Sequence, residues 1–293
     1  MNEAGALERA ARLACWREPV TPEPLAGGIT NRNFLVRHRG ERFVVRIGDD
    51  IPVHQVSRAN ELVASRAAAA AGLSPEVVHH EPGALVLRFI EGRTLRPEDI
   101  RERPMLERIL PLLRCCHREV ERHLRGPVQI FWVFYVLRDY AATLRDGRSR
   151  FLPELSALLE IAEGLRTAIG PVDVAFGHND LLAANFIDTG NRLWLIDWDY
   201  AGFNSPLFDL ANLCSNNELL PADERWLLEI YFERPLSADL ERGYRAMKCA
   251  SLLREAMWGM VSELHSSLNV DYAAYARDYL GRFERCIAEF RQV

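Results

Sequence analysis

The stretch VDVAFGHNDLLAANFIDTGNRLWLIDWDYAG (172–202) interrupts a half of the chain whose other segments have the periodicity of helices. Short apolar runs alternate here with polar residues, and 188–191 is a turn signal, so the stretch predicts short strands that carry polar loops. A polar side chain between apolar strands costs free energy unless it finds a partner or serves a function. Its polar residues are therefore the first candidates for a functional site.

Three of these polar residues have the spacing that phosphoryl transfer requires. Asp180 can orient an acceptor hydroxyl and take its proton. Asn185 follows in the same loop and Asp197 follows the turn, so both can offer hard oxygen ligands to Mg²⁺ beside a nucleotide triphosphate. Protein kinases show the same order of a base, an amide five residues later and a metal-binding carboxylate. The spacing predicts an ATP- and Mg²⁺-dependent kinase.

Two neighbouring residues have separate interpretations. His178 is expected to bond backbone around the loop and not to transfer protons. Asp199 either supplies a second metal ligand or braces the loop, and the first role is slightly favoured. A lone loop aspartate is more often a cap or turn residue, so the prediction depends on all three site residues together.

The pattern before residue 92 is typical of a small β-sheet. NFLVRHR and RFVVRIG flank the turn at Gly40, and PEVVHH and ALVLRFI flank the turn at 81–83, which predicts two hairpins. SRANELVASRAAAAAG lies between the pairs and predicts a helix that ends at Gly72. Residues 1–92 are predicted to form a nucleotide-binding lobe.

The pattern after Gly92 is mainly helical. The amphipathic stretches lie near residues 104–123, 131–146, 151–169, 221–232, 237–264 and 270–291. The fold class is therefore α+β, with residues 93–293 as a helical lobe for catalysis and acceptor binding.

The first lobe offers candidates for holding phosphates. In LAGGITNRNFLV (25–36), the backbone at Gly27 and Gly28 can approach phosphates closely. Arg46 on the next strand and Glu61 on the helix match the kinase pair of a phosphate-binding cation and its acidic partner, with arginine in place of lysine. The alternative is that Arg46 and Glu61 form only a surface ion pair. Thr30 and Asn31 complete the set of predicted cofactor-binding residues in this lobe.

The composition excludes several other classes. The 293 residues, 48% of them hydrophobic, can bury a core without disulfides, and the six cysteines form no CxxC pair. The net charge of −5 gives no basic footprint for nucleic acid. The N-terminus does not resemble a signal peptide, and no apolar run reaches the roughly 18 residues of a membrane span. We expect a cytoplasmic protein with reduced thiols.

These motifs resemble the choline/ethanolamine kinase branch of the kinase-like aminoglycoside phosphotransferase superfamily. The resemblance covers nearly the whole chain and is carried by GGITNRNF, VVRIG, FGHNDLLAANF, LIDWDYAGFNSPLFDLAN and REAMWGM. It implies a two-lobed kinase-like fold, Mg-ATP as cofactor, and phosphorylation of the hydroxyl of a small amino alcohol.

The same resemblance assigns roles to individual positions. It implies that Asp180 is the base, that Asn185 and Asp197 bind magnesium, and that Arg46 contacts phosphate with Glu61 as its partner. Residues 88–92, which include Phe89 and Ile90, resemble the hinge that receives the adenine.

The resemblance also suggests where the acceptor binds. A quaternary ammonium is best held over aromatic faces. Tyr200, Trp258, Tyr272 and Tyr275 fall at matching or nearby positions, and Tyr200 and Trp258 are the firmest candidates. Two departures count against choline in particular, because Val261 stands where the family has a second tryptophan and Asn216 replaces an acidic residue. Asp209 resembles a loop anchor.

Other interpretations stay open at this point. A kinase of the same fold could phosphorylate thiamine, an aminoglycoside or a sugar. A nucleotide-binding pseudokinase or scaffold would lack at least one of Asp180, Asn185 and Asp197, and all three are present.

Overall fold

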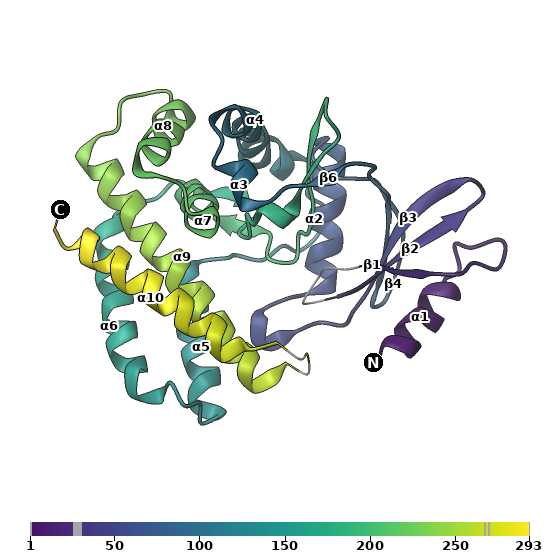
Figure 1. Ribbon diagram of the computed structural model, residues 1–293, viewed down its shortest axis with the longest axis horizontal. Coiled ribbons are helices and arrows are strands. Elements are labelled where there is room, and N and C mark those ends of the chain that lie inside the picture. The colour runs from purple at the N-terminus through teal and green to yellow at the C-terminus, as the bar shows by residue number, and fades with distance from the viewer. Residues whose placement is uncertain (1, 26–30, 267, 269, 293) are drawn as a thin grey trace.

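An antiparallel sheet and a larger helical body lie side by side in the computed structural model of the chain (Figure 1). The structure describes residues 2–25, 31–266, 268 and 270–292. The sheet and the helical body correspond to the β-rich and helical halves of the sequence. The predicted α+β, two-lobed kinase-like fold is therefore confirmed.

The smaller lobe is built on a five-stranded sheet with the order β1-β2-β3-β5-β4. Both predicted hairpins are present, β2 with β3 and β4 with β5. The first hairpin turns through Arg39 and Gly40, whose φ angles of 53° and 79° give the left-handed pair that fits a tight hairpin turn. The helix α1 (Glu3–Ala11) packs on this sheet and was not predicted. The strands are β1 (Glu23–Leu25), β2 (Arg32–His38), β3 (Glu41–Ile47), β4 (Val77–Glu81) and β5 (Ala84–Arg88).

The helix α2 (Arg58–Ala70) links the two lobes. It ends before Gly72, which has a φ of 77° and closes the helix as predicted. Three of its alanines, Ala64, Ala67 and Ala68, are fully buried and belong to the core of the helical lobe, although the helix follows directly from the sheet. Small side chains allow this close approach, so α2 carries Glu61 to the boundary between the lobes.

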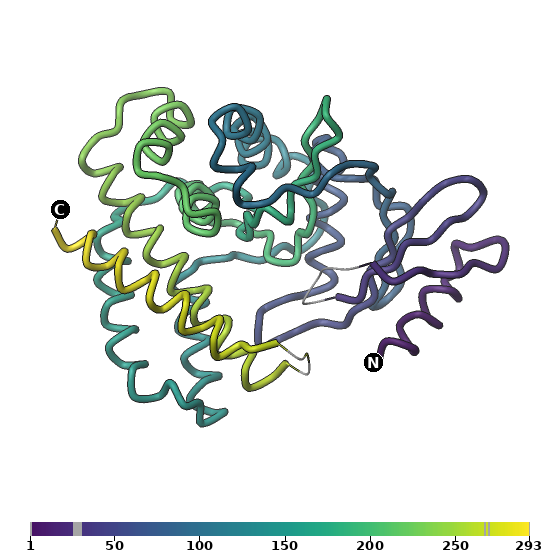
Figure 2. Tube along the Cα trace, in the orientation of Figure 1, coloured from purple at the N-terminus to yellow at the C-terminus, as the bar shows by residue number. Residues whose placement is uncertain are grey.

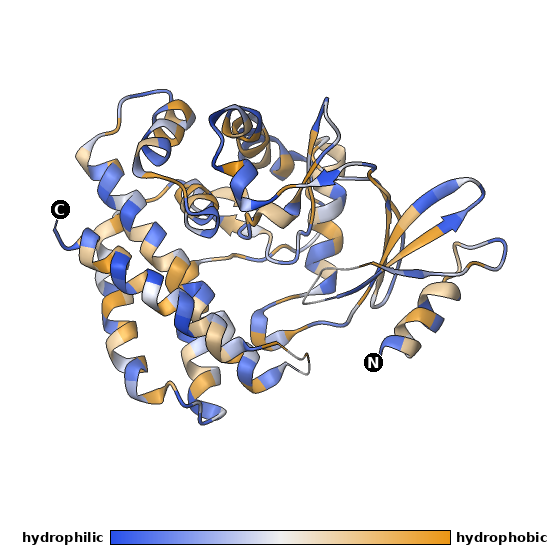
Figure 3. Cartoon of the chain, in the orientation of Figure 1, coloured by the Kyte–Doolittle hydropathy of each residue, from blue (hydrophilic) through white to orange (hydrophobic). Residues whose placement is uncertain are grey.

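The larger lobe is organised around the 28-residue helix α9, which packs against α5, α6, α7 and α10. Figure 2 shows α10 turning back along α9, so that the C-terminus lies at the end of the lobe where α9 begins. Along most of the helices, apolar and polar residues alternate in the manner of amphipathic helices (Figure 3). The helices are α3 (Pro97–Ile100), α4 (Arg103–Glu119), α5 (Val133–Asp146), α6 (Leu152–Ile169), α7 (Pro206–Asn217), α8 (Pro221–Phe232), α9 (Ala238–His265) and α10 (Tyr272–Phe290).

The predicted helices agree with these bounds within a few residues. One difference is that the stretch 104–123 ends as an α-helix at Glu119 and continues as a 3-10 turn. The helix α7 was not predicted, because every residue from Phe208 to Asn217 is buried and no polar face marks its period. All six cysteines are free thiols. Among the described residues, no helix has both the length and the apolarity of a membrane span.

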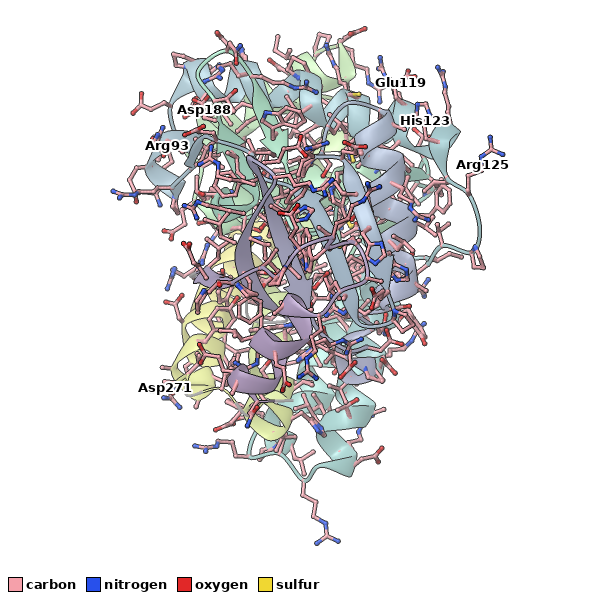
Figure 4. All side chains as sticks on the ribbon, turned by 90° about the vertical axis from the view of Figure 1, so that its right-hand side faces the viewer. Arg93, Glu119, His123, Arg125, Asp188 and Asp271 are labelled. Carbon is pink, nitrogen blue, oxygen red and sulfur yellow. The ribbon has the colours of Figure 1, made fainter. Side chains whose placement is uncertain are left out.

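Two small sheets form the predicted strand-and-loop segment. One pairs β7 (Ala175–Gly177) with β10 (Gly202–Asn204), and the other has the order β6-β8-β9. The hairpin of β8 (Phe186–Asp188) and β9 (Leu193–Leu195) encloses the predicted turn. The strand β6 (Arg93–Thr94) arrives from the end of the smaller lobe, and Figure 4 shows Arg93 beside Asp188, its opposite residue in the ladder. These sheets hold the loops that follow β7 and β9.

Candidate active site

The loop after β7 is fixed by the buried carboxylate of Asp209 on α7. Its two oxygens accept hydrogen bonds from the backbone N–H groups of His178 and Asn179, at 2.8 and 2.7 Å. His117 Nε2 lies 2.9 Å from one of the same oxygens. Burial alone would raise the pKa of Asp209, but these hydrogen bonds hold that pKa below its ordinary value. Asp209 therefore acts as a charged anchor for the loop, the role that the resemblance suggested.

Replacing this anchor should destabilise the fold. Asp209→Asn keeps the shape but loses the charge and places an N–H₂ group against N–H donors. We expect the free energy of unfolding to fall by about 2 kcal/mol, the range for a charge-assisted buried hydrogen bond. Urea unfolding of the variant and the wild type measures this difference. Asp239→Asn, at an exposed carboxylate near the start of α9, is the control and should change little.

His178 takes a structural position in the same loop. Its ring is fully buried, its Nε2 donates to the carbonyl of Ile196 at 2.9 Å, and it packs edge-on against Trp198. Burial is the main influence on the ring and lowers the pKa of His178, so the imidazole is neutral near pH 7. The histidine ties together the two loops that carry Asp180 and Asp197.

Asp180 and Asn185 lie at opposite ends of one turn and face each other. Asn185 Nδ2 donates to the backbone carbonyl of Asp180 at 2.8 Å and lies 3.4 Å from its Oδ2. The Asp180 side chain is 14% exposed. Burial is the largest influence and raises the pKa of Asp180 to about 8, while Arg254 opposes the shift. The geometry leaves a basic carboxylate at the surface of a mostly buried loop.

Asp197 meets the pair of charged residues from the smaller lobe. Arg46 Nη2 donates to Asp197 Oδ1 at 2.8 Å, and Arg46 Nε lies 2.9 Å from Glu61 Oε1. Arg46 and Glu61 are 7% and 2% exposed, so they form a buried pair between the lobes and not a surface ion pair. Asp197 has a φ of 68°, a left-handed backbone that directs its carboxylate toward this pair. The structure thus brings residues of both lobes together.

Asp199 belongs to the same charge network. Its Oδ1 accepts hydrogen bonds from Arg46 and Arg58, each at 3.0 Å, and Asn31 Nδ2 lies 3.3 Å from its Oδ2. Arg58 also bonds Glu61 at 2.7 Å. Sequence reasoning missed Arg58, although its position three residues before Glu61 on a helix was an available signal. These contacts indicate that Asp199 holds the two lobes together.

The structure describes only some of the other residues that were predicted to bind the nucleotide. Phe89 and Ile90 are half-buried in the segment that joins the lobes and line a cavity of 780 Å³ together with Trp194. Gly27, Gly28 and Thr30 lie outside the described residues.

Four predicted acceptor residues come together around Trp258. Trp258 Nε1 donates to the Tyr200 hydroxyl at 2.9 Å. The Trp258 ring contacts those of Tyr272 and Tyr275 edge-on, with centroids 5.9 and 5.5 Å away. Trp258 and Tyr272 also line a cavity of 450 Å³ that reaches the start of β2. The aromatic residues form one cluster, and Val261 is buried in the core near it.

Two charged residues of α9 complete this region and were missed. Arg254 is 1% exposed, and its Nη1 donates to Glu255 and lies 3.8 Å from Asp180 Oδ1. Glu255 accepts a hydrogen bond from Tyr275 at 2.8 Å. Both lie in the stretch REAMWGM that carries the family resemblance, but two charged residues in a helix normally indicate a solvated face, so neither was predicted as a site residue.

His54 connects the smaller lobe to this cluster. Its Nδ1 lies 3.3 Å from the Tyr140 hydroxyl and its Nε2 lies 3.0 Å from the Ser262 hydroxyl. The ring also stacks on Trp258 at 5.2 Å. Burial is the main cause that lowers the pKa of His54 from 6.5 to about 3, so the folded protein holds it neutral.

Acid should therefore weaken the fold through His54. The unfolded chain takes up a proton on this residue below pH 6.5 and the folded chain does so only near pH 3, so stability falls as the pH falls through that window. From pH 7 to pH 5, the wild type should lose about 2 kcal/mol more unfolding free energy than His54→Gln. Urea unfolding at both pH values measures the difference, and equal losses would contradict the prediction.

Comparison with known proteins shows the family of the chain. Residues 23–219 match the choline/ethanolamine kinase family. The chain is 28% identical to protein LicA of Haemophilus influenzae, over 84% of this chain and 75% of LicA. It is 27% identical to ethanolamine kinase 2 of Rattus norvegicus, over 89% and 75% of the two chains.

A solved structure of a choline/ethanolamine kinase family protein from Mesorhizobium loti is 31% identical. It superposes with a TM-score of 0.77 over 98% of this chain and 94% of that one. The match to the family covers more than half of the chain and includes every residue of the Asp180, Asn185 and Asp197 constellation. The chain is therefore a small-molecule kinase that belongs to the choline/ethanolamine kinase family.

Proposed function

We propose that the chain transfers the γ-phosphoryl group of ATP, with Mg²⁺, to the hydroxyl of a small amino alcohol, choline or ethanolamine first of all. One set of contacts carries the proposal. Asn185 faces Asp180, and its backbone carbonyl accepts the N–H of Ile196, next to Asp197, at 2.9 Å. Asp197 in turn bonds Arg46 of the Arg46–Glu61 pair where the lobes meet. Membership of the choline/ethanolamine kinase family supports the acceptor class. We further propose that it acts in the cytoplasm and serves phospholipid metabolism.

Asp180 is the proposed base. It orients the acceptor hydroxyl and takes its proton as that oxygen attacks the phosphorus and ADP leaves. Burial raises the pKa of Asp180, which makes its carboxylate a stronger base than an exposed one. No other described carboxylate in this loop combines partial exposure with contact to Asn185.

The residues present fit a magnesium ion. Asn185 commits its Nδ2 to Asp180, which leaves its amide oxygen as the atom for a metal, and the Asp197 side chain is 25% exposed. Carboxylate and amide oxygens are the ligands that Mg²⁺ prefers. A bound Mg²⁺ neutralises charge on the transferring phosphates. Asp199 stays a predicted second ligand, and in this role its carboxylate would give up part of its contact with Arg46 and Arg58.

The nucleotide is proposed to lie between the lobes. Arg46, held by Glu61, contacts its phosphates, and Gly27, Gly28, Thr30 and Asn31 stay predicted nucleotide-binding residues. The segment that contains Phe89 and Ile90 receives the adenine.

An ATP-consumption screen over amino alcohols, thiamine, aminoglycosides and sugars tests the proposal. We expect Mg²⁺-dependent ADP release with an amino alcohol and none without an acceptor. Release only with thiamine, an aminoglycoside or a sugar would contradict the acceptor class and leave the kinase chemistry standing. ATP binding with no turnover on any acceptor would indicate the pseudokinase alternative.

A further inference from the structure

Arg254 occupies the aromatic surface on which a cationic acceptor is expected to bind. Its guanidinium carbon lies 4.3 Å from the centroid of the Tyr200 ring and 5.7 Å from that of Phe131. This is the geometry of a cation over an aromatic face. Tyr200 was one of the two firmest candidates for holding a quaternary ammonium, so the chain itself already places a cation there.

The other firm candidate, Trp258, is also covered by a side chain of the protein. His54 covers Trp258 in a stacked arrangement, at 5.2 Å and an interplanar angle of 30°. Tyr272 and Tyr275 meet the Trp258 ring with interplanar angles of 67° and 63°, so neither is stacked on its face. A trimethylammonium group has no N–H to donate and depends on open aromatic faces. This cluster therefore suits such a group poorly.

The region is instead rich in buried polar groups that lack partners. Arg254 Nε and Nη2 have no hydrogen-bond partner in the described part of the chain. The same holds for both side-chain polar atoms of Asn216, which is 8% exposed. A buried polar group without a partner costs free energy that a ligand recovers when it supplies one.

The position of Asn216 on α7 indicates that its side chain faces the predicted acceptor region. It lies one helical turn beyond Asn212, whose Oδ1 accepts the N–H of Leu181, next to Asp180, at 2.6 Å. Asn212 Nδ2 also donates to Ser251 of α9, one turn before Glu255. Residues four apart share one face of a helix, so Asn216 faces α9 as well.

We propose that Arg254 is a specificity-determining residue that selects acceptors whose amine donates N–H hydrogen bonds and disfavours quaternary ammonium groups. This inference rests on the proposed function. Arg254 covers the Tyr200 face, and its two unpartnered donors bind the oxygen of the acceptor near Asp180. Asn216 Oδ1 accepts from the amine. A primary amine offers the N–H groups that this arrangement requires, and each methyl group removes one.

The series from ethanolamine through N-methyl- and N,N-dimethylethanolamine to choline tests the proposal. For the wild type, kcat/KM should fall with each methyl group, by about tenfold or more over the series. Arg254→Met keeps an unbranched apolar stem and frees the Tyr200 face, so it should reduce the ethanolamine-to-choline ratio of kcat/KM by about tenfold.

Arg103→Met is the matched control. Arg103 also lies over an aromatic ring, with its guanidinium carbon 4.1 Å from the Trp226 centroid, and its ion pair is with Asp223. It should leave the ratio unchanged. Because Arg254→Met leaves Glu255 without its cation, the double variant Arg254→Met/Glu255→Gln is measured in parallel, with circular dichroism to verify folding.

The outcomes separate the inference from the proposed function. A wild-type series that is flat or favours choline would overturn the role of Arg254. So would equal ratios for the wild type and both Arg254 variants, or a change of the same size in Arg103→Met. A wild type that phosphorylates no member of the series but does phosphorylate another acceptor would overturn the proposed amino-alcohol function itself.

Discussion

Asp180→Ala is expected to lower kcat by about 10³-fold, because a positioned general base contributes roughly 10²–10⁴ to the rate and its carboxylate also orients the hydroxyl. Nucleotide affinity should stay nearly unchanged, since the predicted nucleotide contacts lie on other residues. Steady-state ADP release gives kcat, and isothermal titration with ATP and Mg²⁺ gives the affinity. The separation of these two quantities is what assigns Asp180 to proton transfer.

Asp173→Ala provides the control for this prediction. Asp173 is an exposed carboxylate just before β7, so its removal changes the charge by the same amount without touching the site. It should retain wild-type kcat. Turnover of Asp180→Ala at the wild-type rate would mean that another residue is the base.

Asp197→Ala should weaken Mg-ATP binding and lower kcat/KM by roughly 10³-fold, since a metal ion contributes several kcal/mol of charge stabilisation and each 1.4 kcal/mol is tenfold. ATP titrations with Mg²⁺ and with EDTA separate the two roles of the residue. The loss should appear with Mg²⁺ and largely vanish with EDTA. An equal loss in both would indicate that Asp197 acts through Arg46 and not through a metal.

Asp199→Asn is the informative companion, because Asp199 bonds Arg46 and Arg58. If it is chiefly a brace, the variant should lose unfolding free energy and keep its dependence on Mg²⁺ concentration. A shift in the Mg²⁺ concentration for half-maximal rate, similar to that of Asp197→Asn, would assign it as the second ligand.

Much of the fold could be predicted because its signals are local. The hairpin turn at Gly40 and the helix end at Gly72 each depend on residues close together in the chain. The long amphipathic helices of the second lobe show their period directly. The helix α7 could not be predicted in this way, because burial on every side removes the polar face that reveals a helix.

In the site, too, contacts that follow a known sequence pattern could be predicted and contacts made only by helix packing could not. Arg46 and Glu61 were expected as a pair from the kinase pattern, and they are in contact. Arg254 and Glu255 were not expected, because neighbouring opposite charges on a helix normally face solvent and only the packing of α9 buries them. His54 likewise gains its role from helices far away in the sequence.

The sequence by itself predicted a kinase, because Asp180, Asn185 and Asp197 lie on one short strand-and-loop segment at the spacing of a base and two metal ligands. Only the tertiary structure decided what surrounds the predicted acceptor-binding residues. That region is assembled from helices distant in the chain, so the position of Arg254 over Tyr200 depends on how α9 packs against the loop after β9. Spacing along the chain cannot specify a contact between side chains that only helix packing brings together.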